Sequence, residues 1–382
     1  MTAEEKYAIL ESVFKERPVA GKRVTIKMIA QEAGVSPATV SRVVNNKRNV
    51  RPELAERVRE AIRKLDYHAN EVARGLVRGT VDTFGVVVPD ISNTFFSRIC
   101  KAIQNTVMPT GAAVFLHNTD GILNRERQII KELASKLITG IFLVAPRMPA
   151  TEIRTLADEL GVYPVVVDAR VENCRLAAVW VDNVTAFIEA SEHLISKGHK
   201  RIGFIAGPLA VANSKDRLDG YRIALRNHGI KEDTSLIYES DFTIAGGYKT
   251  AKEMFRKRNP PTAVLCSNDL MAVGVLSYLH KEGVEVPSEI SVVGCDDIDV
   301  ASSLSPPLTT VSQPIYELGV TAAQMMLQYT STNEVPPNSI LHAKLIIRNS
   351  TSNVQEGKSE SETHPAEQLS HNVQVQQERD NR

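Results

Sequence analysis

The chain has 382 residues, 43% of them hydrophobic, and its 45 basic residues balance 45 acidic ones. This length predicts two or three domains, and the hydrophobic content supports sizeable cores. No apolar run reaches the roughly 18 residues that a membrane-spanning helix requires, so no membrane partner is expected. A net charge of zero, taken alone, argues against binding to nucleic acid. The distribution of charge along the chain must therefore be examined to decide whether one segment is basic enough to bind it.

The N-terminal extension, residues 1–23, is too rich in charge to be a signal peptide. Its residues Tyr7, Leu10 and Phe14 have the spacing of a short amphipathic helix. The four cysteines show no CxxC spacing and are expected to be reduced thiols of a cytoplasmic protein, without a disulfide or metal role: Cys100, Cys174, Cys266 and Cys295.

Residues 24–45, VTIKMIAQEAGVSPATVSRVVN, are predicted to form two short helices with a tight turn between them. Thr25 is a hydroxyl residue before an apolar-periodic run, and Gly34 can end that helix with a positive φ. Ser36 is the next N-cap, and Pro37 occupies the first helical position, where a missing N–H costs nothing. This arrangement is typical of a helix-turn-helix, whose second helix enters the major groove of DNA.

The second helix of this segment is predicted to have an inner and an outer face. The inner face packs on the first helix through Val40, Val43 and Val44. The outer face carries small residues and one arginine, namely Ala38, Ser41 and Arg42. Small residues allow close approach to DNA, and arginine makes bidentate contacts to guanine. An ordinary helical hairpin in a protein core is the alternative.

Basic residues are concentrated in this part of the chain. Thirteen basic and six acidic residues lie between Lys22 and Thr80, an excess of seven positive charges. Such an excess is typical of a phosphate-binding surface. A third helix, residues 52–65, is predicted to close the core through a stripe formed by Leu54, Val58, Ala61, Ile62 and Leu65. Most of its basic residues are interpreted as a solvated face: Arg57, Arg59, Arg63 and Lys64.

Residues 24–45 resemble the DNA-binding headpiece of the lactose-repressor/galactose-repressor (LacI/GalR) family of bacterial transcription regulators. The family's run VTIxxVAxxAGVSxxTVSRVxN matches nearly throughout, with Met28 and Ile29 where Asp and Val are usual. The resemblance implies a repressor of genes for sugar or related carbon metabolism that binds double-stranded, pseudo-palindromic operator DNA as a homodimer. Arg42 and Ala38 are expected to face bases. The other DNA contacts expected here are Thr25, Ser36, Pro37, Thr39, Ser41 and Asn45.

Residues 69–80 are expected to be a hinge. Asn70 is a good N-cap, but a helix of about two turns is marginal alone because nucleation is costly. The resemblance implies that it folds on DNA beside its dimer partner and levers a leucine between base pairs in the minor groove. The contacts expected from this hinge are Asn70, Ala73 and Leu76. A plain linker is the alternative.

From Thr83 onward, short apolar strands alternate with helices, which implies parallel sheets covered by helices on both faces. The predicted strands are 84–89, 112–117, 140–144, 164–168, 201–206, 236–240, 262–267, 290–295, 309–313 and one near 341–347. The predicted helices are 95–107, 124–137, 151–160, 184–197, 216–228, 245–257, 269–282 and one from 315.

The expected fold is therefore an all-α helix-turn-helix headpiece (24–68) with a hinge helix (69–80), followed by a two-lobed α/β core (81–350). This core resembles the periplasmic sugar-binding fold. Its first lobe is expected at about 81–181 plus 314–338, and its second at about 182–311 plus 339–350. The polar tail, 351–382, has too few apolar residues for a core and no leucine heptads, so a disordered tail and a dimer are expected.

Ligands of open α/β sheets bind beyond the carboxyl ends of the strands. Aromatic rings there offer a platform for a sugar, and polar side chains supply donors and acceptors for its hydroxyl groups. The resemblance assigns effector contacts to Phe95, Phe96, Asp168, Arg217, Phe242, Asn268, Asp296 and Gln313. Asn118 and Asn213 join them because they also follow strands. A helix cap remains open for Asn268, and lobe packing for the two adjacent phenylalanines.

Two further positions bear on the pocket, Cys295 on the shape of its floor and Val211 on the ligand class. Cys295 stands where the family commonly has Tyr or Phe. Val211 stands where purine sensors tend to carry Arg, which favours a sugar or sugar derivative as the effector.

Enzymatic readings find little support. A Mg²⁺ site at Asp296, Asp297 and Asp299 is disfavoured, because adjacent residues cannot face the same way on one strand. The motifs GxGxxG, GxxxxGKS and GxSxG are missing from the sequence. His193 and His199 flank a helix end and are interpreted as capping or surface residues. Neither catalysis nor a cofactor is therefore expected; a sugar-binding receptor without a DNA role and a sugar-modifying enzyme are the alternatives.

Overall fold

The computed structural model describes residues 24–44, 50–65, 83–136, 138–171 and 174–354. The chain divides into two compact units, Met1–Val81 and Asp82–Arg382. None of the helices in these ranges is both long and apolar enough to cross a membrane.

The first unit is a three-helix headpiece made of α2 (Ile26–Ala33), α3 (Pro37–Val44) and α4 (Pro52–Lys64). Thr25 caps α2 by accepting a 3.4 Å hydrogen bond from the Met28 amide, and Gly34 ends α2 with a φ of 63°. Ile29, Val40 and Val58 are fully buried where the three helices meet. The capping and core residues expected from the sequence are therefore confirmed.

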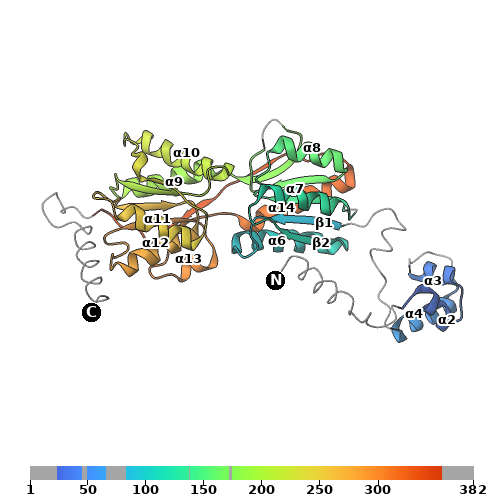
Figure 1. Cartoon of the computed structure of the whole chain (residues 1–382). Helices are drawn as coiled ribbons and strands as arrows, with labels where there is room; N and C mark the ends of the chain where they lie inside the picture. Colours follow the sequence, from blue (N-terminus) through green and yellow to red (C-terminus); the bar gives the residue numbers. More distant parts are fainter. Residues whose placement is uncertain (1–23, 45–49, 66–82, 137, 172–173, 355–382) are drawn as a thin grey trace, which may run out of the picture. The chain divides into compact units, whose positions relative to one another are not determined.

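The second unit contains two lobes, each with a six-stranded sheet (Figure 1). The first sheet has the order β11-β5-β4-β3-β1-β2 and is parallel throughout. Its strands are β1 (Thr83–Val88), β2 (Ala113–Asn118), β3 (Gly140–Val144), β4 (Tyr163–Val167), β5 (Ala177–Val181) and β11 (Ser339–Leu341). Two helices pack on one face, α6 (Thr94–Val107) and α14 (Ile315–Thr332), and two on the other, α7 (Leu123–Ala134) and α8 (Ala150–Leu160). A single 3-10 turn, η1 (Met108–Thr110), follows α6.

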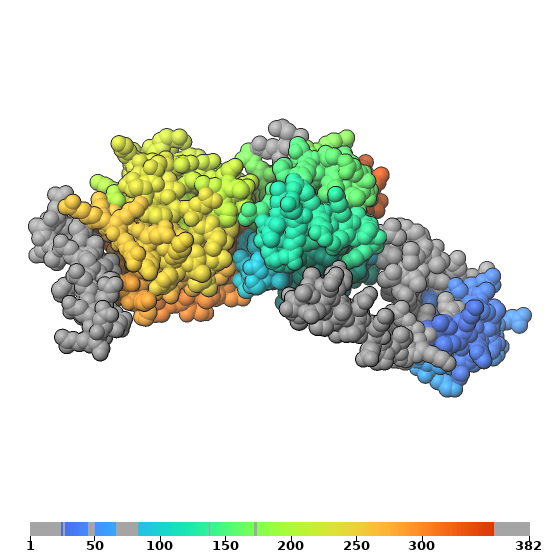
Figure 2. Space-filling model, in the orientation of Figure 1, coloured from blue at the N-terminus to red at the C-terminus, as the bar shows by residue number. Residues whose placement is uncertain are grey.

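The second sheet has the order β12-β10-β9-β8-β6-β7, and only β12 runs antiparallel within it. Its strands are β6 (Ile202–Ala206), β7 (Ile237–Glu239), β8 (Ala263–Cys266), β9 (Ser291–Asp296), β10 (Thr309–Ser312) and β12 (Lys344–Ile346). One face carries α9 (Asn183–Ser196) and α10 (Ala212–Asn227), and the other α11 (Ile244–Phe255) and α12 (Asp269–Lys281). The short elements are η2 (Thr234–Leu236) and α13 (Asp299–Ser303). Figure 2 shows the surfaces of the two lobes, the first mainly in teal and green and the second mainly in yellow and orange.

The structure adds elements that the sequence did not predict. Strand β5 begins with Ala177 and Ala178, residues of low β propensity, and α13 has only five residues. The predicted terminal strand is two strands, β11 in the first sheet and β12 in the second. The chain therefore returns to the second lobe after Leu341, whereas the sequence placed this return at residue 339.

The tail predicted to be disordered from residue 351 is ordered in its first four residues, Thr351–Val354, and residues 355–382 lie outside the described ranges. Thr351 bonds to His193 at 3.0 Å, and the Ser352 carbonyl lies 3.1 Å from Nε2 of His199. His199 is only 3% exposed. The surface interpretation of His199 is therefore wrong: this buried ring holds Ser352 against the second lobe.

Candidate functional site

The outer face of α3 has the character that DNA recognition requires. Ala38 and Arg42 are exposed, as are Ser36 and Pro37 before them. Thr39 is half-buried, and its amide donates a 3.1 Å hydrogen bond to the Ser36 hydroxyl. The cap thus fixes the start of α3 and leaves the Arg42 guanidinium at the surface. Ser41 is half-buried on the same helix, and Asn45, Asn70, Ala73 and Leu76 lie outside the described residues.

The basic side chains of α4 are mostly engaged with acidic neighbours. Glu56 lies 3.0 Å from Arg59 and 3.2 Å from Arg63. Lys64 lies 2.5 Å from Glu32 of α2. These pairs are exposed, so each contributes little to stability. They agree with the interpretation of α4 as a solvated face.

The carboxyl ends of the strands in the core carry unusual backbone geometry. Seven described residues other than glycine have positive φ, and six of these lie at or just beyond a strand end: Asp120, Ala145, Asp168, Phe242, Asp296 and Asp297. Such conformations cost of the order of 1–3 kcal/mol each and concentrate at ligand-binding sites. The two sheets therefore present a strained edge at which ligand contacts are expected.

Arg217 of α10 is the centre of this edge. Its side chain is buried at 4% exposure. Its Nε donates a 2.8 Å hydrogen bond to Asn183, a second guanidinium nitrogen donates to the carbonyl oxygen of Ser267, and its charge lies 5.7 Å from the ring of Phe187. Burial lowers the pKa of Arg217, but the neighbouring carboxyl groups of Asp296, Asp168 and Asp216 raise it, and the net result is a pKa above the ordinary value.

Asp168 brings the first lobe into contact with the second. It follows β4, is 3% exposed and has a φ of 57°. Its backbone carbonyl oxygen accepts a 2.8 Å hydrogen bond from Asn213 of α10. Burial raises the pKa of the Asp168 carboxyl to about 6, although Arg217 acts in the opposite direction. Both predicted residues thus meet where the lobes touch.

Asp296 and Gln313 form a second polar pair. The amide nitrogen of Gln313 donates a 2.7 Å hydrogen bond to Asp296 and lies 3.5 Å from the sulfur of Cys295. Burial raises the pKa of Asp296 well above its usual range, again against Arg217. Burial also raises the pKa of the Cys295 thiol, so this group is a neutral neighbour of the pair.

The aromatic residues occupy different environments. Phe242 has a φ of 65°, and its ring lies so close to Gly207 that a Cβ there would come within 2.0 Å of it. This close approach fixes the ring at the carboxyl end of β6. Phe95 is 4% exposed and packs in the core of the first lobe, edge-on to the half-buried Phe96 at 5.2 Å. Lobe packing therefore accounts for Phe95, whereas Phe242 and Phe96 keep exposed surface.

Two predicted residues are engaged by the fold itself. Asn268 accepts a 2.9 Å hydrogen bond from the Met271 amide as the N-cap of α12, and it donates to the Phe242 carbonyl at 3.0 Å. The alternative of a helix cap is therefore confirmed for Asn268. Asn118 accepts a 2.9 Å hydrogen bond from the Ile91 amide and donates to Asp120. It organises the loop after β1.

Several buried polar atoms at this edge have no partner. The described residues contain seven such side-chain atoms, and four of them belong to the surroundings of Arg217: Oδ1 of Asp168, Oγ of Ser214, Oγ of Ser267 and Oε1 of Gln313. Buried polar groups are almost always hydrogen-bonded in native proteins. Four exceptions in one place indicate a site that is completed by a ligand.

Sequence reasoning missed three residues of this network, Asn183, Ser214 and Ser267. Asn183 follows β5, so the missed strand also hid the residue. Ser214 lies in the first turn of α10, which was predicted to begin only at Asp216. Ser267 directly precedes the predicted Asn268, and only the structure shows that its carbonyl oxygen accepts from Arg217.

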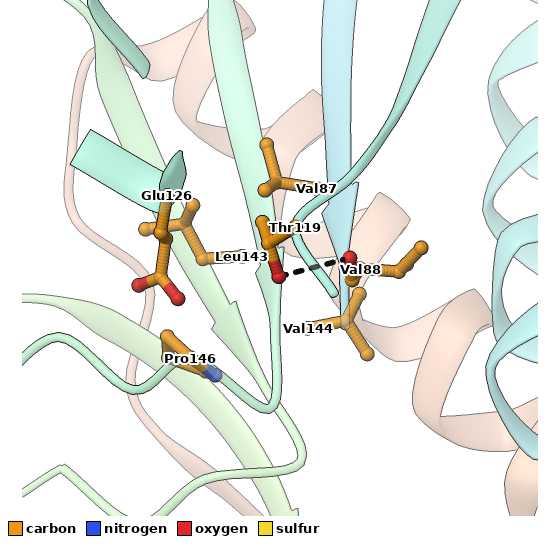
Figure 3. A pocket seen from close by; sticks show the side chains of 7 residues that line it. All are labelled: Val87, Val88, Thr119, Glu126, Leu143, Val144 and Pro146. Carbon is orange, nitrogen blue, oxygen red and sulfur yellow. Dashed lines mark hydrogen bonds between the residues drawn. The ribbon is translucent and has the colours of Figure 1, made fainter. Parts of the chain in front are cut away.

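A recess lies within the first lobe, lined by Val87, Val88, Thr119, Glu126, Leu143, Val144 and Pro146 (Figure 3). It is too narrow to admit a water-sized sphere. The Glu126 carboxylate accepts hydrogen bonds from the amides of Arg147 at 3.0 Å and Met148 at 3.1 Å. This recess is therefore a packing gap beside a carboxylate that holds the loop after β3.

Comparison with known proteins agrees with this architecture. Residues 25–70 match the model of the bacterial regulatory proteins of the lacI family, and residues 191–351 match the periplasmic binding protein-like domain. The chain is 36% identical to the HTH-type transcriptional repressor CytR of Escherichia coli (strain K12) over 329 residues, which are 86% of this chain and 96% of that relative.

Solved structures give the same result. The lac repressor dimer bound to operator and the anti-inducer ONPF matches with a TM-score of 0.79 and 28% identity, covering 87% of this chain and all of that one. A LacI family transcriptional regulator from Enterococcus faecium with bound ribose matches with a TM-score of 0.65 and 28% identity, covering 72% of this chain and all of that one.

A helix-turn-helix headpiece and a two-lobed core with a polar edge define a transcriptional regulator with a ligand-sensing domain. The chain belongs to the lacI family of bacterial regulatory proteins. The family and the fold class expected from residues 24–45 and from the βα alternation are thereby confirmed.

Proposed function

We propose that this regulator is a homodimeric, cytoplasmic repressor of carbon-metabolism genes whose operator affinity is set by a small hydroxyl-bearing ligand at Arg217. The observation that carries this proposal is the group of four partnerless buried atoms around that arginine. Each such atom costs about 1–3 kcal/mol when left unsatisfied, and a ligand with several hydroxyl groups can satisfy all four. The ribose bound to the regulator from Enterococcus faecium supports a sugar as the ligand class.

The proposed DNA contacts follow from the exposure of α3. Arg42 and Ala38 read base edges in the major groove, because they are the outward-facing residues of the second helix. The backbone contacts come from around the turn and the first cap: Thr25, Ser36, Pro37, Thr39, Ser41 and Asn45. In the hinge, outside the described residues, Asn70, Ala73 and Leu76 keep the minor-groove role expected from the sequence.

The dimer is supported by an exposed sheet edge. Strand β2 is the last strand of the first sheet, and its Phe115 and Leu116 are 40% and 46% exposed. Met108 and Ile122, in the segments on either side of this strand, are 62% and 53% exposed. An apolar edge strand pairs readily with another chain. A two-fold symmetric dimer formed here matches the symmetry of a pseudo-palindromic operator.

The proposed ligand site includes Phe96, Asp168, Asn213, Arg217, Phe242, Asp296 and Gln313. Asn183, Ser214 and Ser267 are included as well, because they are bonded to Arg217 or carry partnerless oxygens near it. Phe95, Asn118 and Asn268 are left out of the proposed contacts, because Phe95 packs in the core of the first lobe, Asn118 holds the loop after β1, and Asn268 caps α12. Residues of both lobes take part, so occupancy favours one arrangement of the lobes over another. The ligand can change operator affinity only through this difference in affinity for the two arrangements.

Selection of binding sites from random DNA with the full-length protein, followed by fluorescence anisotropy at several salt concentrations, tests the proposal. A symmetric consensus and an affinity that falls steeply with salt are expected. Enrichment of no symmetric sequence contradicts the proposal.

A further inference from the structure

The C-terminal end of α10 carries a surface recess of about 440 Å³, called the α10 recess below. Its lining comes from the last turns of α10 and from the turn that follows: Arg222, Leu225, Arg226, Gly229, Ile230, Lys231 and Glu232. Leu225 is buried and Ile230 is half-buried, so the recess has an apolar floor. The proposed ligand site uses Asn213, Ser214 and Arg217 from the first half of the same helix. The α10 recess therefore belongs to a different surface.

The rim of the α10 recess is positively charged. Arg222 lies 3.1 Å from Glu232 and 3.8 Å from Asp219, so its charge is compensated. Arg226 and Lys231 are exposed, and in the described part of the chain no carboxylate lies within ion-pair distance of either. Two uncompensated cations beside an apolar floor match a peptide that combines acidic and small apolar residues.

The backbone at this end of α10 does not oppose an anionic occupant. The carbonyl oxygen of Leu225 accepts a 2.9 Å hydrogen bond from the Ile230 amide, and that of Arg226 accepts a 3.1 Å hydrogen bond from the Gly229 amide. Unsatisfied carbonyl oxygens are what makes a helix C-terminus negative, and these two are satisfied within the turn. An acidic peptide thus meets side-chain cations rather than these carbonyl groups.

The described chain ends beside the C-terminal end of α9, the helix that packs on the same face of the second sheet as α10 (Figure 1). The Val354 amide donates a 2.9 Å hydrogen bond to the carbonyl oxygen of Lys197, which directly follows α9. Four residues further on, Arg201 pairs with Asp233 at 3.3 Å, and Asp233 adjoins Glu232 of the recess. The path from Val354 to the recess thus crosses four residues, at most about 14 Å, and one pair of side chains.

The sequence beyond Val354 has the matching charge. Residues 355–367, QEGKSESETHPAE, contain four glutamates and one lysine. A Pro-Ala pair stands between Glu362 and Glu367, so the apolar residues are flanked by carboxylates. Twelve residues can extend over about 40 Å, which exceeds the path to the recess. Because the recess and this segment belong to one chain, even a weak attraction suffices to join them.

We propose that the α10 recess is the docking site of this chain's own acidic segment, residues 356–367. The glutamates pair with Arg226 and Lys231, and the Pro-Ala pair covers the apolar floor. The ion pairs are exposed, so salt weakens the contact. While docked, the segment keeps other acidic peptides away from this surface. This inference depends neither on the proposed ligand nor on operator binding.

Carbodiimide cross-linking of the full-length protein tests the contact, because this reagent joins a carboxylate to an amine only where the two touch. Mass spectrometry should find Lys231 joined to glutamates of residues 356–367. Lys252, exposed on α11 at the opposite face of the sheet, is the control amine and should give at least about fivefold less of such products. The Lys231 products should fall at least about threefold when the salt concentration rises from about 0.05 M to about 0.5 M.

Charge reversal tests the rim. Arg226→Glu changes an exposed side chain, so the fold should be unaffected, and the Lys231 products should fall by at least about fivefold. Arg256→Glu, at the exposed end of α11, is the matched control and should leave these products unchanged. Equal yields for the two variants overturn the role of the rim.

Refolding an isotope-labelled copy together with unlabelled protein before cross-linking identifies the source of the segment. Docking within one chain gives Lys231 products that carry a single isotope. Products that mix the isotopes show that the recess receives the segment of a second copy. Cross-links from Lys231 to none of the glutamates beyond Val354 show that the recess does not receive this segment. Either of the last two results overturns the proposal.

Discussion

Asn213 of α10 donates a 2.8 Å hydrogen bond to the backbone carbonyl oxygen of Asp168, which follows β4 in the other lobe. Both residues are buried, at 4% and 3% exposure. This contact joins a helix of the second lobe to a strand end of the first, next to the arginine that the ligand is proposed to contact. We propose that this contact links the arrangement of the lobes to the occupancy of the ligand site.

Replacement of Asn213 by alanine tests this link. Asn213→Ala leaves the Asp168 carbonyl oxygen without a donor, a loss of about 1–3 kcal/mol in the arrangement that contains the contact. Ligand affinity should fall by about tenfold, as measured by calorimetry. Asn227→Ala, at the exposed end of the same helix, is the matched control and should bind normally. Equal ligand affinities for the two variants would show that the contact between Asn213 and Asp168 does not contribute to ligand binding.

Two serine substitutions should separate binding from stability. Ser350→Ala removes a hydroxyl that accepts from the Thr309 amide at 2.8 Å and donates to the Val292 carbonyl at 2.6 Å. It should lower the free energy of unfolding by about 1–3 kcal/mol without changing ligand affinity. Ser267→Ala should leave the free energy of unfolding unchanged and weaken ligand binding, because the Ser267 hydroxyl has no partner within the protein. Urea denaturation and calorimetry on both variants measure the two quantities, and a loss of stability in Ser267→Ala would argue for a purely structural serine.

The stability of the core should depend on pH through Asp168. Its pKa in the folded protein, about 6, lies above its ordinary value of 3.8. A raised pKa means that the stabilising contribution is complete below about pH 3.8 and is lost as the pH rises through 6. The loss amounts to at most about 3 kcal/mol, at about 1.36 kcal/mol for each pH unit between the two values. Asp168→Asn should therefore gain stability relative to the parent protein at pH 7.5 but not at pH 4. A stability difference that is the same at pH 4 and at pH 7.5 would show that the pKa of Asp168 is not raised in the folded protein.

Arg42 should matter for operator recognition more than any basic residue of α4. Arg42→Ala should weaken binding by about 1–3 kcal/mol and relax the preference at one base pair of each half-site. Arg59→Ala is the matched control, because Arg59 is paired with Glu56 on the exposed side of α4. Anisotropy with operators that differ at single positions measures both. A similar loss for the two variants would indicate non-specific charge attraction.

The fold was largely predictable because local signals and tertiary packing agree. The headpiece follows from caps at Thr25 and Ser36 and from the buried faces of its helices, which are short-range features. The alternation of apolar strands with helices likewise predicts the parallel sheets. The prediction failed where signals were weak: β5 begins with two alanines, and the first turn of α10 contains Asn213 and Ser214, which favour non-helical conformations.

The site was predictable only in part, for a related reason. Residues that follow strands, such as Asp168, Asp296 and Gln313, are found by position alone, and the structure brings them together around Arg217. The sequence does not reveal how each side chain uses its hydrogen-bonding capacity. Asn268 is engaged as a helix cap, whereas the unnoticed Ser267 beside it has a partnerless hydroxyl. Satisfaction of polar atoms depends on contacts between distant segments, which no local pattern encodes.

The most direct test of the account measures operator affinity of the full-length protein as a function of ligand concentration. Anisotropy with the selected symmetric operator should show a dissociation constant that changes by at least about fivefold when a sugar identified by a thermal-shift screen saturates the protein. The midpoint of that change should match the calorimetric affinity of the sugar, and Asn213→Ala should shift it to higher concentration. Binding of the sugar without any change in operator affinity would contradict the account.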